Sequence, residues 1–127
     1  MPVLIVYGMP HIPPGGAATD QILEGLVDDL QKVAAQVLNL HKEEISVFLP
    51  RDLVNSGLGK ELVCMVEGLF EKPERTIEVR QQLAESIKSA LYYFAQEYLP
   101  SCPKIEVLVK RFNQDVDGFA VYHGLGM

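Results

Sequence analysis

Residues 3–9 read Val-Leu-Ile-Val-Tyr-Gly-Met, and residues 61–70 read Glu-Leu-Val-Cys-Met-Val-Glu-Gly-Leu-Phe. Both segments are apolar runs that reach a glycine, a pattern typical of a buried β-strand that ends in a turn. A shift of sixty residues superimposes the two segments and places Gly8 on Gly68. Because self-similarity at a fixed spacing indicates a structural repeat, we predict that the chain consists of two related halves.

The same sixty-residue shift aligns the segments that follow. The aligned pairs are Leu23 with Leu83, Ala35 with Ala95, Ile45 with Ile105, Val47 with Val107, and Arg51 with Arg111. They keep one unbroken register through a helix and a strand, so each half is predicted to run strand, helix, strand.

The predicted helices cover residues 20–38, capped by Thr19 or Asp20, and a segment from Pro73 to about Leu99. In both segments the apolar side chains recur at helical spacing and form one face. The inward positions are Leu23, Leu26, Val27, Leu30, Val33, Ala34 and Val37 in the first helix, and Ile77, Leu83, Ile87, Ala90, Leu91, Phe94 and Tyr98 in the second.

The remaining predicted strands are residues 45–49 and 104–110, and a short last strand at 119–123 is expected to pair with a neighbouring chain. The chain is thus predicted to be one domain of two pseudo-equivalent β-α-β halves, at about 1–58 and 61–118. The expected fold class is α/β, in detail α+β, with a four-stranded sheet and two helices on one face.

Both faces of this sheet are expected to be apolar. One face is predicted to carry Val3, Ile5, Val47 and Val107. The other face is predicted to carry Leu4, Val6, Phe48, Val66 and Leu108. Two helices cover only one face, and an exposed apolar sheet of this size favours association. We therefore expect a partner subunit to cover the second set.

The amino-acid composition and net charge exclude several classes of protein. Of the 127 residues, 48% are hydrophobic and 22% are charged, which is typical of a compact globular domain rather than a disordered chain. The formal net charge of −6 gives no general attraction to nucleic acid or to an anionic membrane surface, so neither is expected as a partner. No segment reaches the length of a membrane span, and no signal peptide is expected.

Metal and cofactor motifs are absent from the sequence. Cys64 and Cys102 have no CxxC spacing, and the three histidines are scattered. Neither the GxGxxG pattern nor the P-loop pattern occurs. We therefore expect no metal and no cofactor, and two reduced thiols in a cytoplasmic protein.

Pro2 directly precedes the first predicted strand of a twice-repeated β-α-β unit. This arrangement resembles the tautomerase superfamily, closest to its two-repeat members such as macrophage migration inhibitory factor and related uncharacterised bacterial proteins. The resemblance implies removal of Met1 and a catalytic role for the secondary amine of Pro2. An α-amino group titrates near pH 8, and burial with nearby cations would lower its pKa towards neutrality. The alternative is that Pro2 only starts a strand, where proline is tolerated.

The resemblance also implies a substrate pocket between subunits. Lys42 lies near the family's lysine at the end of the first helix, and Phe70 lies where the family has an apolar wall. Glu106 and Leu108 fall where the migration inhibitory factor has a tyrosine and an asparagine, on the sheet face turned from the helices. Phe119 follows a glycine, where that protein has a tryptophan.

The residues that bind a substrate carboxylate in one member of this family are not matched in this sequence. The carboxylate-binding arginines of 4-oxalocrotonate tautomerase are replaced here by Ser46 in the second strand and by His11 or Ile12 in the loop, which disfavours dicarboxylate binding in that manner. Arg51 and Arg111 end equivalent strands, and either is a candidate to hold an anionic substrate. The alternative for both is a solvated strand end.

Three hypotheses follow. The first is a tautomerase, an isomerase in which Pro2 moves a proton on a small carbonyl acid without a cofactor. The second is a non-catalytic trimer that binds a ligand or a protein through the same pocket. In both, the uncovered sheet face and the resemblance together predict a homotrimer. The third is a ferredoxin-like binding module, which also has two β-α-β halves but a different strand order, and which would pair as a dimer.

Overall fold

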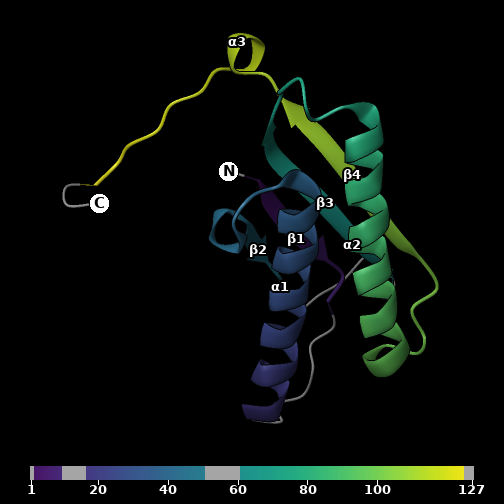
Figure 1. Ribbon diagram of the computed structural model, residues 1–127. Helices are drawn as coiled ribbons and strands as arrows, with labels where there is room; N and C mark the ends of the chain where they lie inside the picture. Colours follow the sequence, from purple (N-terminus) through teal and green to yellow (C-terminus); the bar gives the residue numbers. More distant parts are fainter. Residues whose placement is uncertain (1, 10–16, 51–60, 125–127) are drawn as a thin grey trace.

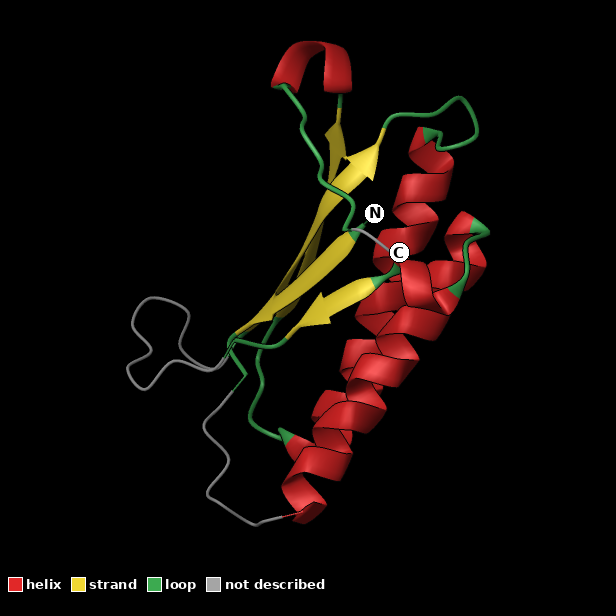
Figure 2. Cartoon of the chain, turned by 90° about the vertical axis from the view of Figure 1, so that its left-hand side faces the viewer, coloured by secondary structure: helices red, strands yellow, loops and turns green. Residues whose placement is uncertain are grey.

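The chain folds into one mixed β-sheet with two long helices against one of its faces (Figures 1 and 2). The computed structural model describes residues 2–9, 17–50 and 61–124. The elements are β1 (Val3–Tyr7), α1 (Ala17–Leu38), η1 (Lys42–Glu44), β2 (Ser46–Phe48), β3 (Leu62–Phe70), α2 (Ile77–Tyr98), β4 (Ile105–Phe112) and α3 (Gln114–Asp117). The strand order is β2-β1-β3-β4, so the predicted fold class is confirmed.

The two halves repeat each other in detail. Helices α1 and α2 differ by sixty residues at both their first and last positions. Within each half the strands are parallel, and the pairing of Val3 with Ser46 recurs as the pairing of Val63 with Glu106. An antiparallel pairing between β1 and β3 joins the halves at the centre of the sheet.

Glycine is required where the first strand ends. Gly8 has a φ of +93°, and a Cβ atom there would lie 2.1 Å from the carbonyl oxygen of Glu61. The equivalent Gly68 also has a positive φ, +68°, and lies in an irregularity of the β3–β4 register between Val66 and Leu69. Both positions therefore adopt a backbone conformation that residues with a Cβ atom rarely adopt.

The hydrophobic core lies between the sheet and the helices. From the sheet it contains Leu4, Val6, Leu62, Cys64, Val66 and Leu69, and from the helices Leu23, Leu26, Leu30, Ala34, Leu83, Ile87, Leu91 and Phe94. The prediction that placed Leu4, Val6 and Val66 on the open face was therefore wrong. Leu4 pairs in register with Val66 and with Val47, and register partners share a face, so all of them turn towards the helices.

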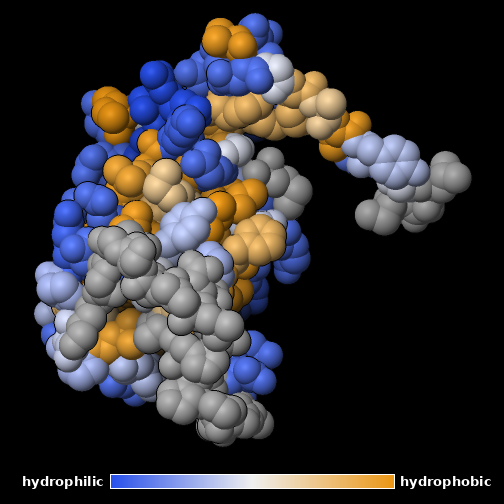
Figure 3. Space-filling view, turned by 180° about the vertical axis from the view of Figure 1, so that it is seen from behind, coloured by the Kyte–Doolittle hydropathy of each residue, from blue (hydrophilic) through white to orange (hydrophobic). Residues whose placement is uncertain are grey.

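The open face carries the alternate residues. Val3 and Ile5 lie on it, whereas they were predicted to share a face with Val47 and Val107, which pack against the core. The prediction was right for Phe48 and Leu108, whose exposures are 58% and 45%. The register joins four residues into one row across all four strands: Phe48, Ile5, Met65 and Leu108. Seen from the side away from the helices, this surface is apolar over the strands (Figure 3).

The helices begin at other residues than predicted, and their last residues agree with the prediction to within one residue. Helix α1 begins at Ala17, so Thr19 and Asp20 lie inside its first turn and not before it. Helix α2 begins at Ile77, where the Thr76 side chain accepts a hydrogen bond from the amide of Val79. Two side chains predicted to face inward, Ile77 and Tyr98, are 58% and 40% exposed, because they lie at the two ends of α2.

The chain leaves the sheet after β4. Residues 118–124 follow the short helix α3 without regular structure, and they extend away from the body of the molecule (Figure 1). The strand predicted at 119–123 is not formed within the single chain, and its pairing with a neighbouring chain stays a prediction. In the described ranges, no helix combines the length and the apolar character that crossing a membrane requires.

Candidate functional site

Pro2 lies at the end of the sheet where β1 and β2 begin. It is buried, and its carbonyl oxygen accepts a hydrogen bond from the Ser46 amide at 3.2 Å. Because β1 and β3 are antiparallel, β3 and β4 terminate at the same end of the sheet. All four strands therefore have one terminus at the end of the sheet where Pro2 lies.

Gly68 follows the last residue of β3 that pairs with β1. The β1–β3 register ends with the pair of Val3 and Glu67, one residue before Gly68. Gly68 adopts a positive φ in the irregular part of β3. The irregular part of β3 therefore lies at the end of the sheet where Pro2 is found.

Three phenylalanines form a cluster at this end of the sheet. The ring of Phe70 lies 5.5 Å from that of Phe112 and 5.1 Å from that of Phe119, centroid to centroid. The sequence predicted Phe70 and Phe119 as pocket residues, and the structure brings them together. It adds Phe112, which is the register partner of Phe70 and was not predicted. The signal available in the sequence was that Phe70 and Phe112 both end strands of the second half.

Lys42 is at the same end of the sheet, but its side chain is engaged. It lies in η1, four residues before the Ser46 that bonds Pro2, and its ammonium forms an ion pair with Asp28 of α1. Asp28 also pairs with Lys32 at 2.7 Å. Hydrogen bonds from Lys32 and Lys42 hold the pKa of Asp28 below its ordinary value. The charge of Lys42 is thus partly used in holding η1 against α1.

Glu106 and Leu108 lie on the open face, away from Pro2 of the same chain. Glu106 pairs in register with Val63, near the opposite end of the sheet, and its carboxylate lies 3.7 Å from the Lys104 ammonium. Leu108 lies in the middle of β4 beside Met65. A single chain therefore does not bring these two residues to Pro2.

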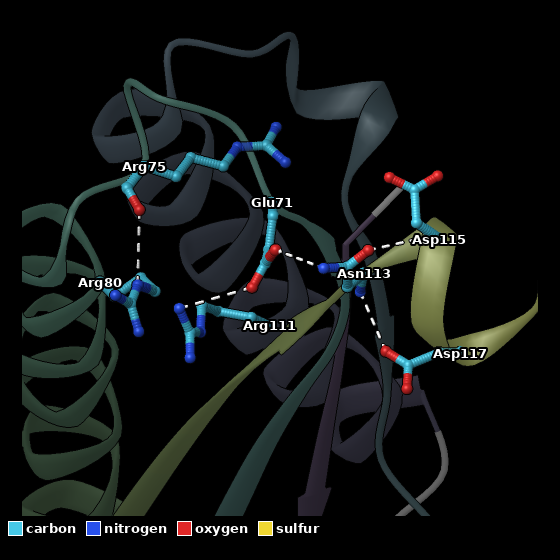
Figure 4. Close-up of polar contacts among 7 residues, drawn as sticks. All are labelled: Glu71, Arg75, Arg80, Arg111, Asn113, Asp115 and Asp117. Atoms are coloured by element: carbon cyan, nitrogen blue, oxygen red, sulfur yellow. Dashed lines mark hydrogen bonds and ion pairs between the residues drawn. The ribbon is translucent and has the colours of Figure 1, made fainter.

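Arg111 lines a polar pocket at the end of β4. Its guanidinium lies 3.4 Å from the Glu71 carboxylate (Figure 4), and its register partner is Leu69, which is buried towards the helices. The pocket measures about 350 Å³. Arg111 and the phenylalanine cluster thus share one end of the sheet but lie on its two faces. Arg51, the other candidate for anion binding, lies outside the described residues, as do the loop positions His11 and Ile12.

Neither thiol is placed for catalysis at the Pro2 end. Cys64 is buried in the core, and burial raises its pKa to about 12, so it stays a neutral thiol. Cys102 is partly exposed and lies 3.4 Å from the Lys104 carbonyl oxygen. Across the described residues, no group of three or more histidine, cysteine, aspartate or glutamate side chains is placed to hold a metal ion.

Comparisons with known proteins give matches in structure only. No protein-family model matches the sequence, and no curated protein matches it. Fused 4-OT, solved as an asymmetric trimer, superimposes with a TM-score of 0.64 at 17% identity, covering 94% of this chain and 91% of its own. Pt0534, inactivated by 2-oxo-3-pentynoate, gives 0.60 at 15% identity and covers 94% and 90%. FG41 malonate semialdehyde decarboxylase, inhibited by 3-bromopropiolate, gives 0.55 at 13% identity and covers 94% and 89%.

These structural neighbours are members of the tautomerase superfamily. The chain shares their fold over nearly its whole length. At identities this low, the likeness shows the fold and leaves activity to be argued from the chain's own residues.

Proposed function

We propose that this chain is a two-repeat, macrophage migration inhibitory factor-like tautomerase, in which Pro2 transfers a proton on a small carbonyl acid. The observation that carries the proposal is the position of Pro2, buried before a central strand with its carbonyl oxygen fixed by the Ser46 amide. The proposal requires removal of Met1, because only then is the Pro2 nitrogen a secondary amine with a free lone pair.

The chemistry needs only this amine and a bound substrate. Burial disfavours the charged form of an amine, so a buried amine at Pro2 would favour the neutral base. The base removes a proton from the carbon next to the substrate carbonyl, and the electrons of that C–H bond form an enolate. The prolinium then returns the proton to the enolate oxygen, which gives the enol, or to the far carbon of a conjugated dienolate, which shifts the double bond. Either step completes the isomerisation without a cofactor.

The proposed pocket lies between subunits of a homotrimer. Each chain would supply Pro2, Phe70 and Phe119, and a neighbouring chain would supply Glu106 and Leu108 from its open face. This division agrees with the separation of those residues within one chain. Exposed apolar side chains on the open face, and the tail with Phe119 at 50% and Tyr122 at 83% exposure, support the assembly.

The second candidate is a non-catalytic trimer that binds a ligand through the same surfaces. It is favoured by the ion pair of Lys42 with Asp28, which partly neutralises the cation expected to assist at Pro2. The ferredoxin-like alternative is not supported, because β1 and β2 pair directly, whereas that fold places another strand between them. We propose a cytoplasmic location, which agrees with two free thiols.

The test combines N-terminal mass with enzyme kinetics. Intact mass of the protein from its native host should show Met1 removed, and phenylpyruvate should tautomerise measurably by ultraviolet absorbance. Pro2→Ala keeps a free amine but loses the ring, and we expect kcat/KM to fall by about 100-fold or more. Lys88→Gln, on α2 where Lys88 pairs with Glu85, should leave it unchanged. Full retention of Met1, or a Pro2→Ala protein as active as wild type, would refute the enzyme.

A further inference from the structure

A cluster of cationic side chains surrounds the pocket at the end of β4. The residues that line it are Glu71, Lys72, Pro73, Arg75, Arg80 and Arg111. Four of these are cationic and one is a carboxylate, so the lining has a net charge of +3 on a chain whose formal net charge is −6. A concentration of positive charge on an acidic protein has an electrostatic cost, because it opposes its own assembly. This cost is offset when the site holds an anion.

The three arginines come from three different segments. Arg75 lies in the loop between β3 and α2, Arg80 in α2, and Arg111 in β4. Their positions are held by the fold: Arg75 donates to the Phe70 carbonyl oxygen at 2.8 Å, and Nε of Arg80 donates to the Arg75 carbonyl oxygen at 3.4 Å. Figure 4 shows the guanidinium groups of Arg80 and Arg111 directed towards each other. Further N–H groups of both remain to bind an anion between them.

Glu71 acts as a support for this arrangement. One of its carboxylate oxygens lies 3.4 Å from Arg111, and the other accepts a hydrogen bond from the Asn113 side chain at 2.9 Å (Figure 4). Asn113 is fixed in turn by hydrogen bonds with Asp115 and Asp117 of α3. The carboxylate therefore orients Arg111 but neutralises only one of the four cations around the pocket.

We propose that this pocket binds the phosphate group of a small phosphorylated molecule. A phosphate monoester is close to a dianion at neutral pH and has three free oxygens, which suits the two neighbouring guanidinium groups of Arg80 and Arg111 and the surplus of positive charge that Lys72 and Arg75 add. A volume of about 350 Å³ accommodates the phosphate and a small organic group. The proposal does not depend on Pro2.

Inorganic phosphate is the probe for the first experiment, with binding followed by calorimetry or amide chemical shifts at constant ionic strength. We expect saturable binding by the wild type and at least a tenfold weaker Kd for Arg80→Gln and for Arg111→Gln. Lys88→Gln removes a cation of α2 that pairs with Glu85 outside the pocket, and it should change the Kd by less than about twofold. Pro2→Ala should bind phosphate like wild type, which separates this site from the proposed catalytic one.

A variant that binds phosphate more tightly than the wild type tests the site in a way that misfolding cannot imitate. Glu71→Gln removes the one carboxylate of the lining while an amide oxygen still faces Arg111, and we expect phosphate to bind about threefold tighter or better. Absence of saturable binding by the wild type would overturn the proposal. So would equal weakening by Lys88→Gln and Arg80→Gln, or tighter binding of malonate than of phosphate.

Discussion

Ile5 and Met65, sixty residues apart in the sequence, are direct partners in the antiparallel pairing of β1 and β3. Each is the equivalent of the other in the repeat, so the local two-fold relation between the halves passes through this pair. The pair continues on one side to Phe48 and on the other to Leu108, which are also equivalents. The open face therefore presents a symmetric apolar row, and assembly is the use that we predict for it.

Phe48→Asp should dissociate the predicted trimer. Phe48 is 58% exposed at one end of the row, and a charge there would have to be buried at a subunit interface. Light scattering on the wild type and the variant measures the change. Tyr93→Asp is the matched control, because Tyr93 is 72% exposed on α2, away from the open face, and this variant should assemble normally. A wild-type protein that is a monodisperse monomer would refute the trimer and the intersubunit pocket with it.

Gly8→Ala should destabilise the protein far more than Gly118→Ala. Both glycines have a positive φ, but an added Cβ meets the Glu61 carbonyl oxygen only at Gly8, and it meets nothing within 4 Å at Gly118. We expect a loss of about 3 kcal/mol or more at Gly8 and of about 1 kcal/mol at Gly118. Urea denaturation at one fixed protein concentration gives both values. Similar losses at the two positions would show that the contact with Glu61 is relieved at little cost.

The two cysteines should differ in reactivity. At pH 8 a thiol reagent such as DTNB should modify the partly exposed Cys102 in the native protein and reach Cys64 only after unfolding. A Cys102→Ser protein that still reacts rapidly would contradict this assignment.

Cys64 should also give the protein an alkaline limit. Burial raises its pKa from 9.0 to about 12, so the folded state holds a proton that the unfolded state releases. Its contribution to stability is complete below pH 9 and is lost as the pH rises from there towards 12. Denaturation midpoints between pH 8 and 11 should fall less steeply for Cys64→Ala than for wild type. Parallel curves would assign the alkaline decline to other groups.

The sequence repeat was enough to predict the element order, because the sixty-residue shift relates strands and helices alike. It was not enough to assign the faces of the sheet. Val3, Leu4, Ile5 and Val6 are all apolar, so alternation gives two sets of residues without indicating which set meets the helices. The register decides which residues of different strands share a face, and the packing of α1 and α2 decides which face is covered. Both depend on contacts between distant segments.

The candidate site, like the fold, could be predicted only in part from the sequence. Pro2 and Phe70 were identified through the resemblance to the tautomerase superfamily, and Arg111 because it stands at a strand end. The residues next to them in the structure were not predicted. These are Phe112 in the aromatic cluster, and Arg75 and Arg80 in the lining of the pocket. No motif in the sequence links these positions, because they converge only when β3, α2 and β4 are packed together.

The two halves repeat the same backbone fold, but the residues at equivalent positions differ in the chemical groups that they carry. The equivalent of Pro2 is Leu62, which lies inside the chain, and its amide donates a hydrogen bond to the Lys104 carbonyl oxygen at 3.0 Å. A backbone amide has no basic lone pair, so the second half has no counterpart of the amine proposed at Pro2. Catalysis by that amine would therefore have a stoichiometry of one per polypeptide, and covalent labelling of it should saturate at one equivalent per chain.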